Sequence, residues 1–235
     1  MLRHPGPGGC GVRAVHAAGA VIRLAVFDLD GTLVDSRQDL ANAANALVTE
    51  LGGAPLPGSR IADMVGEGAA LLVRRLLAAG GLDPELPGAL PRFLDLYDER
   101  LLEHTRPYDG TVAMLEAVGA RLPLAVLTNK PQAATEKLLD GLNLYRFFRD
   151  VIGGDTELGR KPHPAGLGEL ARRAGVPVAS TILIGDSPID LETSRRAGCR
   201  VILLSYGFGF RPTDLRAGEC VAADPCKLSN LLLYP

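Results

Sequence analysis

The sequence predicts an α/β fold, in which a parallel sheet is flanked by helices and carries a small inserted helical domain. Three observations predict it. Short apolar runs typical of buried strands recur along the chain. From Tyr108 onward these runs alternate with amphipathic helical patterns, which is typical of a parallel sheet covered on both faces. The stretch from Ser36 to about His104, in contrast, is helical throughout.

Composition limits the class of protein. The chain has 235 residues, of which 47% are hydrophobic and 22% charged, so it is globular and long enough for one large domain or for a medium and a smaller one. With 25 Lys and Arg against 27 Asp and Glu, the net charge of -2 gives no general attraction to nucleic acid or to an anionic membrane. No apolar run reaches the roughly 18 residues of a membrane-spanning helix. We therefore expect a small-molecule partner, no nucleic acid or membrane partner, and a monomer or a homodimer.

The first twenty residues differ from the rest. Residues 1–20 are rich in Gly and Pro and are interrupted by Arg13 and His16, whereas a secretory signal needs an uninterrupted apolar centre. They predict a flexible leader, or a start codon placed too early. The chain's four cysteines form neither a CxxC pair nor a zinc-type spacing with His, so reduced thiols and a cytoplasmic location fit best.

The first predicted element, an apolar run at 21–27, ends at two carboxylates. Asp28 and Asp30 are separated by one residue and are followed by Gly31, which permits a sharp turn, and by Thr32, which adds a hydroxyl. Carboxylate oxygens are hard donors of the kind that Mg²⁺ prefers. The alternative is an ordinary strand-ending turn, because Asp and Gly are common in turns.

Helical spacing of apolar residues then predicts three helices. Ser36, with Asp39 three residues on, resembles a capping box at the start of the first. The apolar faces of the three helices are, in order, Leu40, Ala44, Leu47 and Leu51, then Ala69, Leu72, Val73, Leu76 and Leu77, then Leu90, Leu94, Tyr97 and Leu101.

This helical segment is longer than a connection requires. A crossover between parallel strands needs only a dozen or more residues. Residues 36–105 are therefore predicted to form a small domain of their own, placed as a lid directly after Asp28. Residues 21–35 and 106–235 are predicted to form the α/β domain.

The second half of the chain alternates between helix and strand. Strands are predicted at 124–127, 151–154, 181–184 and 201–204. Helices are predicted at 111–122, at 131–142, and in a segment that ends at 174.

Polar residues follow the ends of the first four predicted strands. In open parallel sheets, ligands bind outside the carboxyl ends of the strands, so residues far apart in sequence can meet there. Crowded carboxylates repel one another unless a cation lies between them, and a hydroxyl beside a lysine suits an oxyanion. The sequence thus predicts one pocket for Mg²⁺ and a phosphoryl group, built from Asp28 and Asp30, Thr128 and Asn129, Lys161, and Asp186 and Asp190.

Each of these residues also has a simpler interpretation. Thr128 could be a strand-end threonine and Lys161 a solvated lysine. Asp186 and Asp190 could be acids favoured at a helix start, with Ser187 as the cap. Compatible chemistry at four separate strand ends favours the site over these interpretations.

Four segments resemble the four motifs of the haloacid dehalogenase superfamily in order and spacing: DLDGT at 28–32, TN at 128–129, KP at 161–162 and GDSPID at 185–190. The resemblance extends from about Val21 to the C-terminus. It implies a Rossmann-like parallel sheet, and the helical insertion resembles the C1-type cap of that superfamily. Within the superfamily the segments are most similar to those of phosphoglycolate phosphatases.

The resemblance implies a Mg²⁺-dependent phosphatase that works through an aspartyl-phosphate. Asp28 would be the nucleophile. Asp30 would be general acid for the leaving alkoxide and then general base for water. The side chains of Asp28 and Asp186, with the backbone carbonyl of Asp30, would bind Mg²⁺.

Further roles follow from the same resemblance. Thr128, Asn129 and Lys161, helped by backbone N–H groups after Asp28 and after Thr128, would bind the phosphoryl oxygens. Asp190 would hold either the metal shell or Lys161 from a second position.

The cap would choose the substrate, and 2-phosphoglycolate is the preferred candidate. The residues considered for specificity are Gly66, Glu67, Gly68 and Arg74, although Arg74 and its neighbour Arg75 could simply lie on a solvated helix face. The alternatives are a sugar phosphomutase similar to β-phosphoglucomutase, a phosphatase for pyrophosphate or a sugar phosphate, and a non-catalytic phosphate-binding protein. Asp30 argues against halide displacement, because the dehalogenases of the superfamily lack an acid there.

Overall fold

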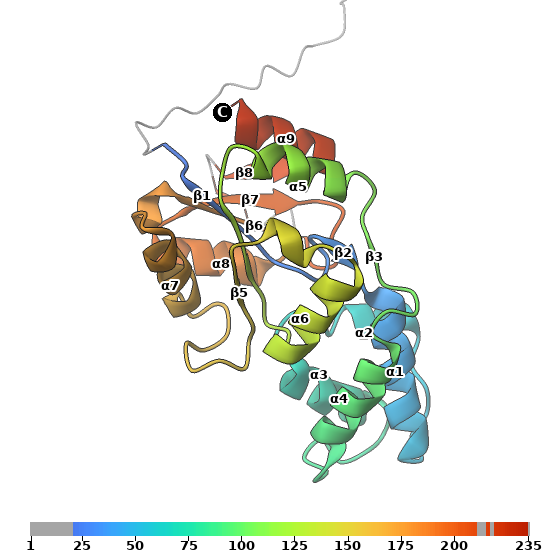
Figure 1. Cartoon of the computed structure of the whole chain (residues 1–235). Coiled ribbons are helices and arrows are strands. Elements are labelled where there is room, and N and C mark those ends of the chain that lie inside the picture. The colour runs from blue at the N-terminus through green and yellow to red at the C-terminus, as the bar shows by residue number, and fades with distance from the viewer. Residues whose placement is uncertain (1–20, 211–214, 217–218, 235) are drawn as a thin grey trace, which may run out of the picture.

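A six-stranded parallel sheet forms the centre of the molecule (Figure 1). The computed structural model describes residues 21–210, 215–216 and 219–234, so the predicted leader at 1–20 lies outside the described residues. The strand order is β5-β4-β1-β6-β7-β8, with every pairing parallel. The strands are β1 (Leu24–Phe27), β4 (Leu124–Leu127), β5 (Asp150–Ile152), β6 (Thr181–Gly185), β7 (Arg200–Leu204) and β8 (Cys220–Ala222). The predicted α/β fold is confirmed.

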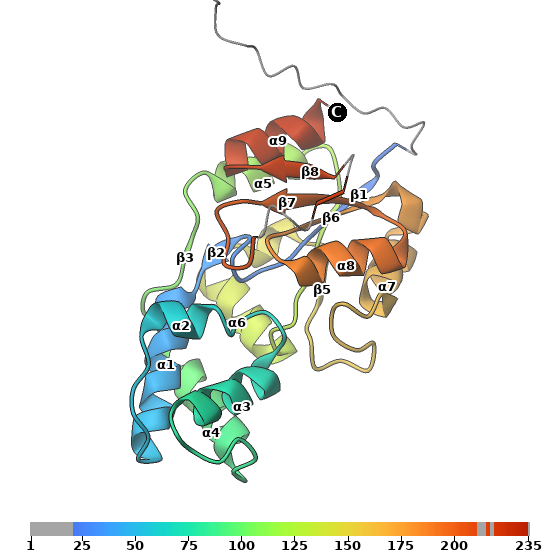
Figure 2. The ribbon, with the colours of Figure 1, turned by 180° about the vertical axis from the view of Figure 1, so that it is seen from behind.

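Helices cover both faces of the sheet, as the two opposite views show (Figures 1 and 2). Alternate residues of the central strand separate the two cores, because successive strand side chains point to opposite faces. Phe27 packs with residues of α5, α6 and α9, whereas Val26 packs with residues of α7. The helices are α5 (Thr111–Gly119), α6 (Gln132–Gly141), α7 (Ala165–Ala174), α8 (Pro188–Ala197) and α9 (Pro225–Leu233), with short 3₁₀ turns at Tyr145–Phe147 and Val178–Ser180.

The remaining helices lie together to one side of the sheet (Figures 1 and 2). The chain reaches them through β2 (Val34–Asp35) and returns through β3 (Arg106–Pro107), and these two short strands pair antiparallel. The helices are α1 (Arg37–Glu50), α2 (Gly58–Ala62), α3 (Ala69–Ala79) and α4 (Ala89–Arg100). The helical insertion thus lies where the sequence predicts it, and its status as a separate domain stays a prediction.

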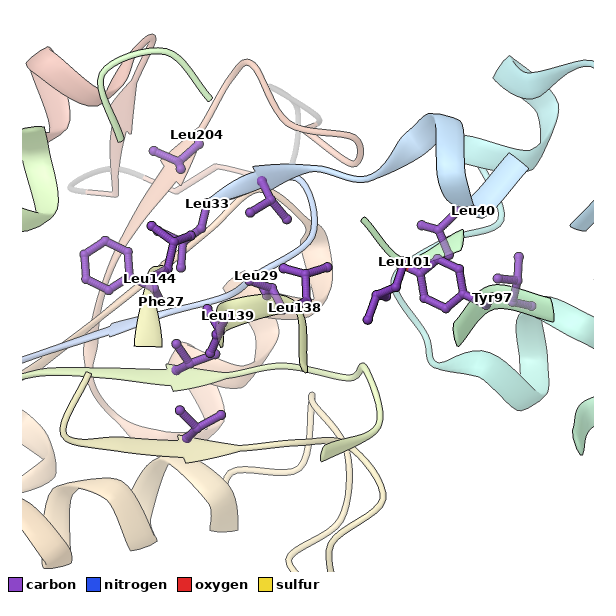
Figure 3. Close-up of a cluster of buried hydrophobic side chains, with 14 of the residues drawn as sticks. Phe27, Leu29, Leu33, Leu40, Tyr97, Leu101, Leu138, Leu139, Leu144 and Leu204 are labelled. Atoms are coloured by element: carbon purple, nitrogen blue, oxygen red, sulfur yellow. The ribbon is translucent and has the colours of Figure 1, made fainter. Parts of the chain in front are cut away.

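The helical segment buries apolar side chains that belong to the same cluster as Phe27 of the sheet. Phe93 and Tyr97 of α4 stack with ring centroids 6.0 Å apart. Figure 3 shows Tyr97 grouped with Leu40 and Leu101, at a distance from Phe27 beside the sheet. Among the described residues, no helix combines the length and the apolar character needed to cross a membrane.

The start of α1 differs from the prediction. The capping box expected of Ser36 and Asp39 is wrong, because both side chains have other partners. The hydroxyl of Ser36 donates to Asp30 at 2.6 Å. The buried carboxylate of Asp39 accepts hydrogen bonds from the backbone N–H groups of His104 and Thr105 and from the Thr105 hydroxyl, at 2.7–3.0 Å. Asp39 therefore ties α1 to the segment that returns to the sheet.

Replacing Asp39 with Asn should loosen this connection. In Asp39→Asn one carboxylate oxygen becomes an NH₂ group that faces backbone donors, so we expect a loss of about 2–3 kcal/mol in the free energy of unfolding. Urea denaturation measures it. Asp35→Asn is the matched control, since Asp35 forms only an exposed pair with Arg37, worth at most about 1 kcal/mol. Equal losses in the two variants would contradict the role given to Asp39.

Candidate active site

The predicted site residues meet at the carboxyl ends of three neighbouring strands. Phe27 of β1 pairs with Val126 of β4 and with Ile184 of β6. This register brings the residues that follow each strand to the same edge of the sheet. Asp28, Thr128 and Asp186 all line one cavity there.

Asp28 lies against a buried lysine. The Nζ of Lys161 is 2.8 Å from Asp28 Oδ1 and 2.6 Å from Asp190 Oδ1, and its side chain is only 2% exposed. The backbone N–H of Leu29 donates to the same Asp28 oxygen at 2.8 Å. Among the described residues, both contacts of the Asp28 carboxylate fall on Oδ1, which leaves Oδ2 for a ligand or a substrate.

Asp190 fits two of the interpretations considered for it, as an acid at a helix start and as the residue that holds Lys161. Its Oδ2 accepts from the backbone N–H and the hydroxyl of Ser187, so it closes the capping box at the start of α8. Its Oδ1 holds Lys161. Asp190 is thereby engaged on both oxygens and positions the lysine from behind.

Asp186 is held by two loops. Its Oδ1 accepts from the hydroxyl of Thr32 at 2.9 Å, and its Oδ2 accepts from the backbone N–H groups of Phe208 and Gly209 at 2.7 and 3.1 Å. Glycine is required at Gly207, where an added Cβ would overlap the Asp186 side chain. The loop after β7 is therefore part of the site, and no motif in the sequence identified it.

Asp30 forms an ion pair with a second buried lysine, Lys130. The Nζ of Lys130 lies 3.0 and 3.1 Å from the two Asp30 oxygens and 2.5 Å from the hydroxyl of Tyr97 in α4, while Ser36 donates to Asp30 from another side. Burial opposes the charge on Lys130, but the Asp30 carboxylate and Tyr97 raise its pKa above the ordinary value, so it is an ammonium at neutral pH. Lys130 was not among the residues predicted to form the site, although it follows Thr128 and Asn129 directly.

Asn129 is placed differently from Thr128. Its side-chain amide donates to the backbone carbonyls of Gly66 and Lys161 and accepts from the N–H of Lys161, at 2.8–3.0 Å. These contacts engage the Asn129 side chain with backbone groups, whereas the predicted help in phosphate binding was that of the backbone N–H after Thr128. Thr128 lines the cavity with a hydroxyl that accepts only from the N–H of Lys130, at 3.3 Å among the described residues.

The cavity lies between the sheet and helices α1–α4. It encloses about 720 Å³ of space, open solvent included. Its helical side is mainly apolar and comprises Leu40, Val65, Ala69, Leu72, Phe93, Leu94 and Tyr97.

The four specificity candidates divide into two pairs. Gly66 and Gly68 line the cavity. Glu67 instead pairs with Arg75, and Arg74 pairs with Glu85, with all four side chains at least 37% exposed. The structure does not bring Glu67 or Arg74 to the cavity.

The acids at this edge fit a divalent cation. Oxygens of Asp28, Asp186 and Asp190 lie within 4.8 Å of one another. Burial raises the pKa of Asp28 to about 6, although Lys161 opposes the rise. Burial, with the charges of Asp190 and Asp28, raises the pKa of Asp186 to about 7. Because Asp28 and Asp186 line the cavity and Asp190 does not, Asp28 and Asp186 are the acids suited to a hard metal ion, which would relieve their crowding.

Comparison with known proteins agrees with this geometry. A family model described as haloacid dehalogenase-like hydrolase matches residues 25–204. The chain belongs to the haloacid dehalogenase-like hydrolases. It is similar to the phosphoglycolate phosphatase of Rhodospirillum rubrum, with 40% identity over 218 residues that cover 89% of this chain and 90% of that protein. It is also similar to the phosphoglycolate phosphatase of Neisseria meningitidis, with 36% identity over 203 residues that cover 83% of this chain and 85% of that protein.

Solved structures of this family share the fold. The crystal structure of a predicted phosphoglycolate phosphatase from Haemophilus somnus matches with a TM-score of 0.83 and 27% identity, covering 89% of this chain and 97% of that one. The assignment to the haloacid dehalogenase superfamily, inferred from four short motifs, is confirmed.

The raised pKa values predict how pH governs cation binding to this hydrolase. The carboxyls of Asp28 and Asp186 have an ordinary pKa of 3.8, so the metal-free folded state holds more protons than the unfolded chain at mildly acidic pH. The resulting stabilisation is complete below the ordinary value and is lost as pH rises through about 6 to 7. A cation binds the ionised forms instead, so Mg²⁺ should raise the Tm more at about pH 8 than at about pH 5. Thermal scans test this, and Asp186→Asn should remove most of the difference. Equal shifts at both pH values would contradict it.

A second prediction concerns the loop that holds Asp186. In Gly207→Ala the new Cβ displaces the Asp186 carboxylate, so we expect the affinity for a divalent cation to fall about tenfold or more. Isothermal titration with Mg²⁺ or Mn²⁺ measures it. Gly168→Ala in α7 is the matched control, because an added Cβ there meets no atom within 4 Å. An unchanged affinity in Gly207→Ala would show that this loop does not position Asp186.

Proposed function

We propose that this protein is a phosphoric monoester hydrolase that uses Mg²⁺ and prefers 2-phosphoglycolate. One observation carries the proposal: Asp28, with one oxygen held by Lys161 and the other unengaged, lies in the same cavity as Asp30, Thr128 and Asp186. The relatives named phosphoglycolate phosphatase, at 36–42% identity, support the substrate.

Two displacements at phosphorus account for the reaction. Asp28 attacks phosphorus, the bond from phosphorus to the ester oxygen breaks, and Asp30 gives its proton to the departing alkoxide. Asp30 then takes a proton from water, whose oxygen attacks the phosphorus of the aspartyl-phosphate and releases Asp28 and inorganic phosphate. One difficult displacement is thus replaced by two easier ones.

Lys161 and Thr128 stabilise the phosphoryl group during both displacements. The ammonium of Lys161, fixed between Asp28 and Asp190, lies where it can meet a phosphoryl oxygen as the nucleophile approaches. The hydroxyl of Thr128 supplies a donor from the neighbouring strand end. Because Asp190 holds the lysine rigidly, little reorganisation is needed as charge develops.

The residues that would hold Mg²⁺ are Asp28, Asp186 and the backbone carbonyl of Asp30. When bound, the ion neutralises the repulsion between the anionic nucleophile and the anionic phosphate. Thr32, Phe208 and the neighbouring N–H groups keep the Asp186 carboxylate oriented for this role.

We further propose that residues 36–105 act as a cap domain over this site. The apolar residues that α1, α3 and α4 contribute to the cavity exclude water from the reacting groups. The closeness of the apolar wall to Asp28 and Asp30 favours a small substrate.

Removing the nucleophile tests this function. Asp28→Asn should lower Mg²⁺-dependent phosphate release from 2-phosphoglycolate by at least about a thousandfold, because the amide cannot form the covalent intermediate. Colorimetric phosphate assays measure it. Asp109→Asn, at an exposed position before α5, is the control and should retain wild-type turnover. Comparable activity in Asp28→Asn and wild type would refute the mechanism.

A further inference from the structure

One cation lies in the cavity on the side of the general acid. Of the described residues that line the cavity, Lys130 alone has a positively charged side chain. The two cap arginines, Arg74 and Arg75, form ion pairs outside it. The second buried lysine, Lys161, lies between Asp28 and Asp190, on the side of the nucleophile, where the proposed mechanism assigns it to the phosphoryl group.

Contacts from two parts of the chain fix the Lys130 ammonium. Its Nζ lies 3.0 Å from Asp30 on the loop after β1 and 2.5 Å from the hydroxyl of Tyr97 on α4. It also lies 4.5 Å from the centroid of the Tyr97 ring. The Lys130 side chain is 3% exposed. The charge is thus held at the boundary between the polar floor of the cavity and its apolar wall.

The place of Asp30 determines which part of a substrate meets this charge. A general acid must come within hydrogen-bond distance of the ester oxygen that it protonates. In 2-phosphoglycolate the carboxylate is bonded to the carbon that carries this oxygen. When the ester oxygen lies beside Asp30, the carboxylate of the substrate also lies close to Asp30. Lys130 is the cation paired with Asp30, so it is placed to meet the substrate carboxylate.

The charges of the site require such a partner. Asp28, Asp30 and Asp186 are all acidic, so a second anionic group on the substrate is repelled unless a cation receives it. The apolar residues of α1, α3 and α4 cannot do so. The Lys130 ammonium has three donors, which contact both Asp30 oxygens and the Tyr97 hydroxyl, so it receives a substrate carboxylate by exchanging one Asp30 oxygen for it.

We infer that Lys130 binds the carboxylate of the substrate and selects phosphomonoesters that carry an anionic group next to the ester oxygen. Tyr97 is a positioning residue that holds the ammonium toward the cavity. The inference rests on the proposed phosphatase function and adds the residue that gives it selectivity. It places the specificity cation on the sheet side of the cavity rather than on the cap.

Two substrates that differ only in this group test the inference. Wild type and Lys130→Met are compared by kcat/KM on 2-phosphoglycolate and on 2-hydroxyethyl phosphate, in which an uncharged CH₂OH replaces the carboxylate. Both activities should fall, because Asp30 also loses its partner. The preference for 2-phosphoglycolate should fall by a further factor of about 10 to 100, since a charge-assisted hydrogen bond is lost. Lys137→Met is the matched control, since Lys137 also pairs with α4, at Asp98, but outside the cavity, and its preference should match wild type.

The outcomes separate the inference from the function on which it rests. Equal losses on both substrates, or a wild type that prefers 2-hydroxyethyl phosphate, would overturn the inference while the phosphatase function stands. A wild type that hydrolyses neither substrate would overturn both. If circular dichroism shows that Lys130→Met does not fold, Lys130→Gln and Tyr97→Phe serve in its place. We expect a lost preference in Lys130→Gln and a smaller reduction in Tyr97→Phe, and an unchanged preference in both contradicts the inference.

Discussion

Neutralising the carboxylates buried at the ends of β1 and β6 is the constraint on which the site depends. A buried charge without a partner costs several kcal/mol, by rough estimates, so each acid must be paired or protonated or must bind a cation. The chain meets this need with two buried lysines from other loops, Lys161 at Asp28 and Lys130 at Asp30. Asp186 has backbone and hydroxyl donors but no lysine among the described residues, which is why it is the acid best suited to a metal ion.

The residues that follow β4 also link the sheet to the helical segment. Asn129 and Lys130 follow each other after β4, and both reach across the cavity: Asn129 donates to the carbonyl of Gly66, before α3, and Lys130 donates to Tyr97 in α4. Thr128, which precedes them, is the residue that we propose binds the phosphoryl group. Three successive residues thus join the proposed phosphoryl site, the helices and Asp30, the proposed general acid. Where the helices sit therefore determines how Lys130 meets Asp30.

Much of this architecture could be predicted from the sequence, for definable reasons. Strands buried on both faces give uninterrupted apolar runs, so the predicted strands match β1, β4, β6 and β7 closely. No strand was predicted at β8 (Cys220–Ala222), which has only 3 residues and lies at the sheet edge. The gathering of Asp28, Thr128, Lys161 and Asp186 was predictable because parallel strands end at one edge. Ser36 and Asp39 were misassigned because capping spacing carries no information about distant competing partners.

Lys130 shows why specificity is harder to predict than chemistry. The acids and Lys161 are recognisable from where they stand relative to strands, whereas the role of Lys130 depends on its contact with Tyr97, which is 33 residues away on an inserted helix. Only the folded chain reveals that the cavity wall is apolar and that the cap arginines are paired elsewhere. Since an apolar wall can select size but cannot attract an anion, recognition of a charged substrate falls to the sheet side. The cation there, Lys130, is already paired with Asp30, the proposed general acid. In the proposed mechanism one lysine therefore links the choice of substrate to the protonation of its leaving group.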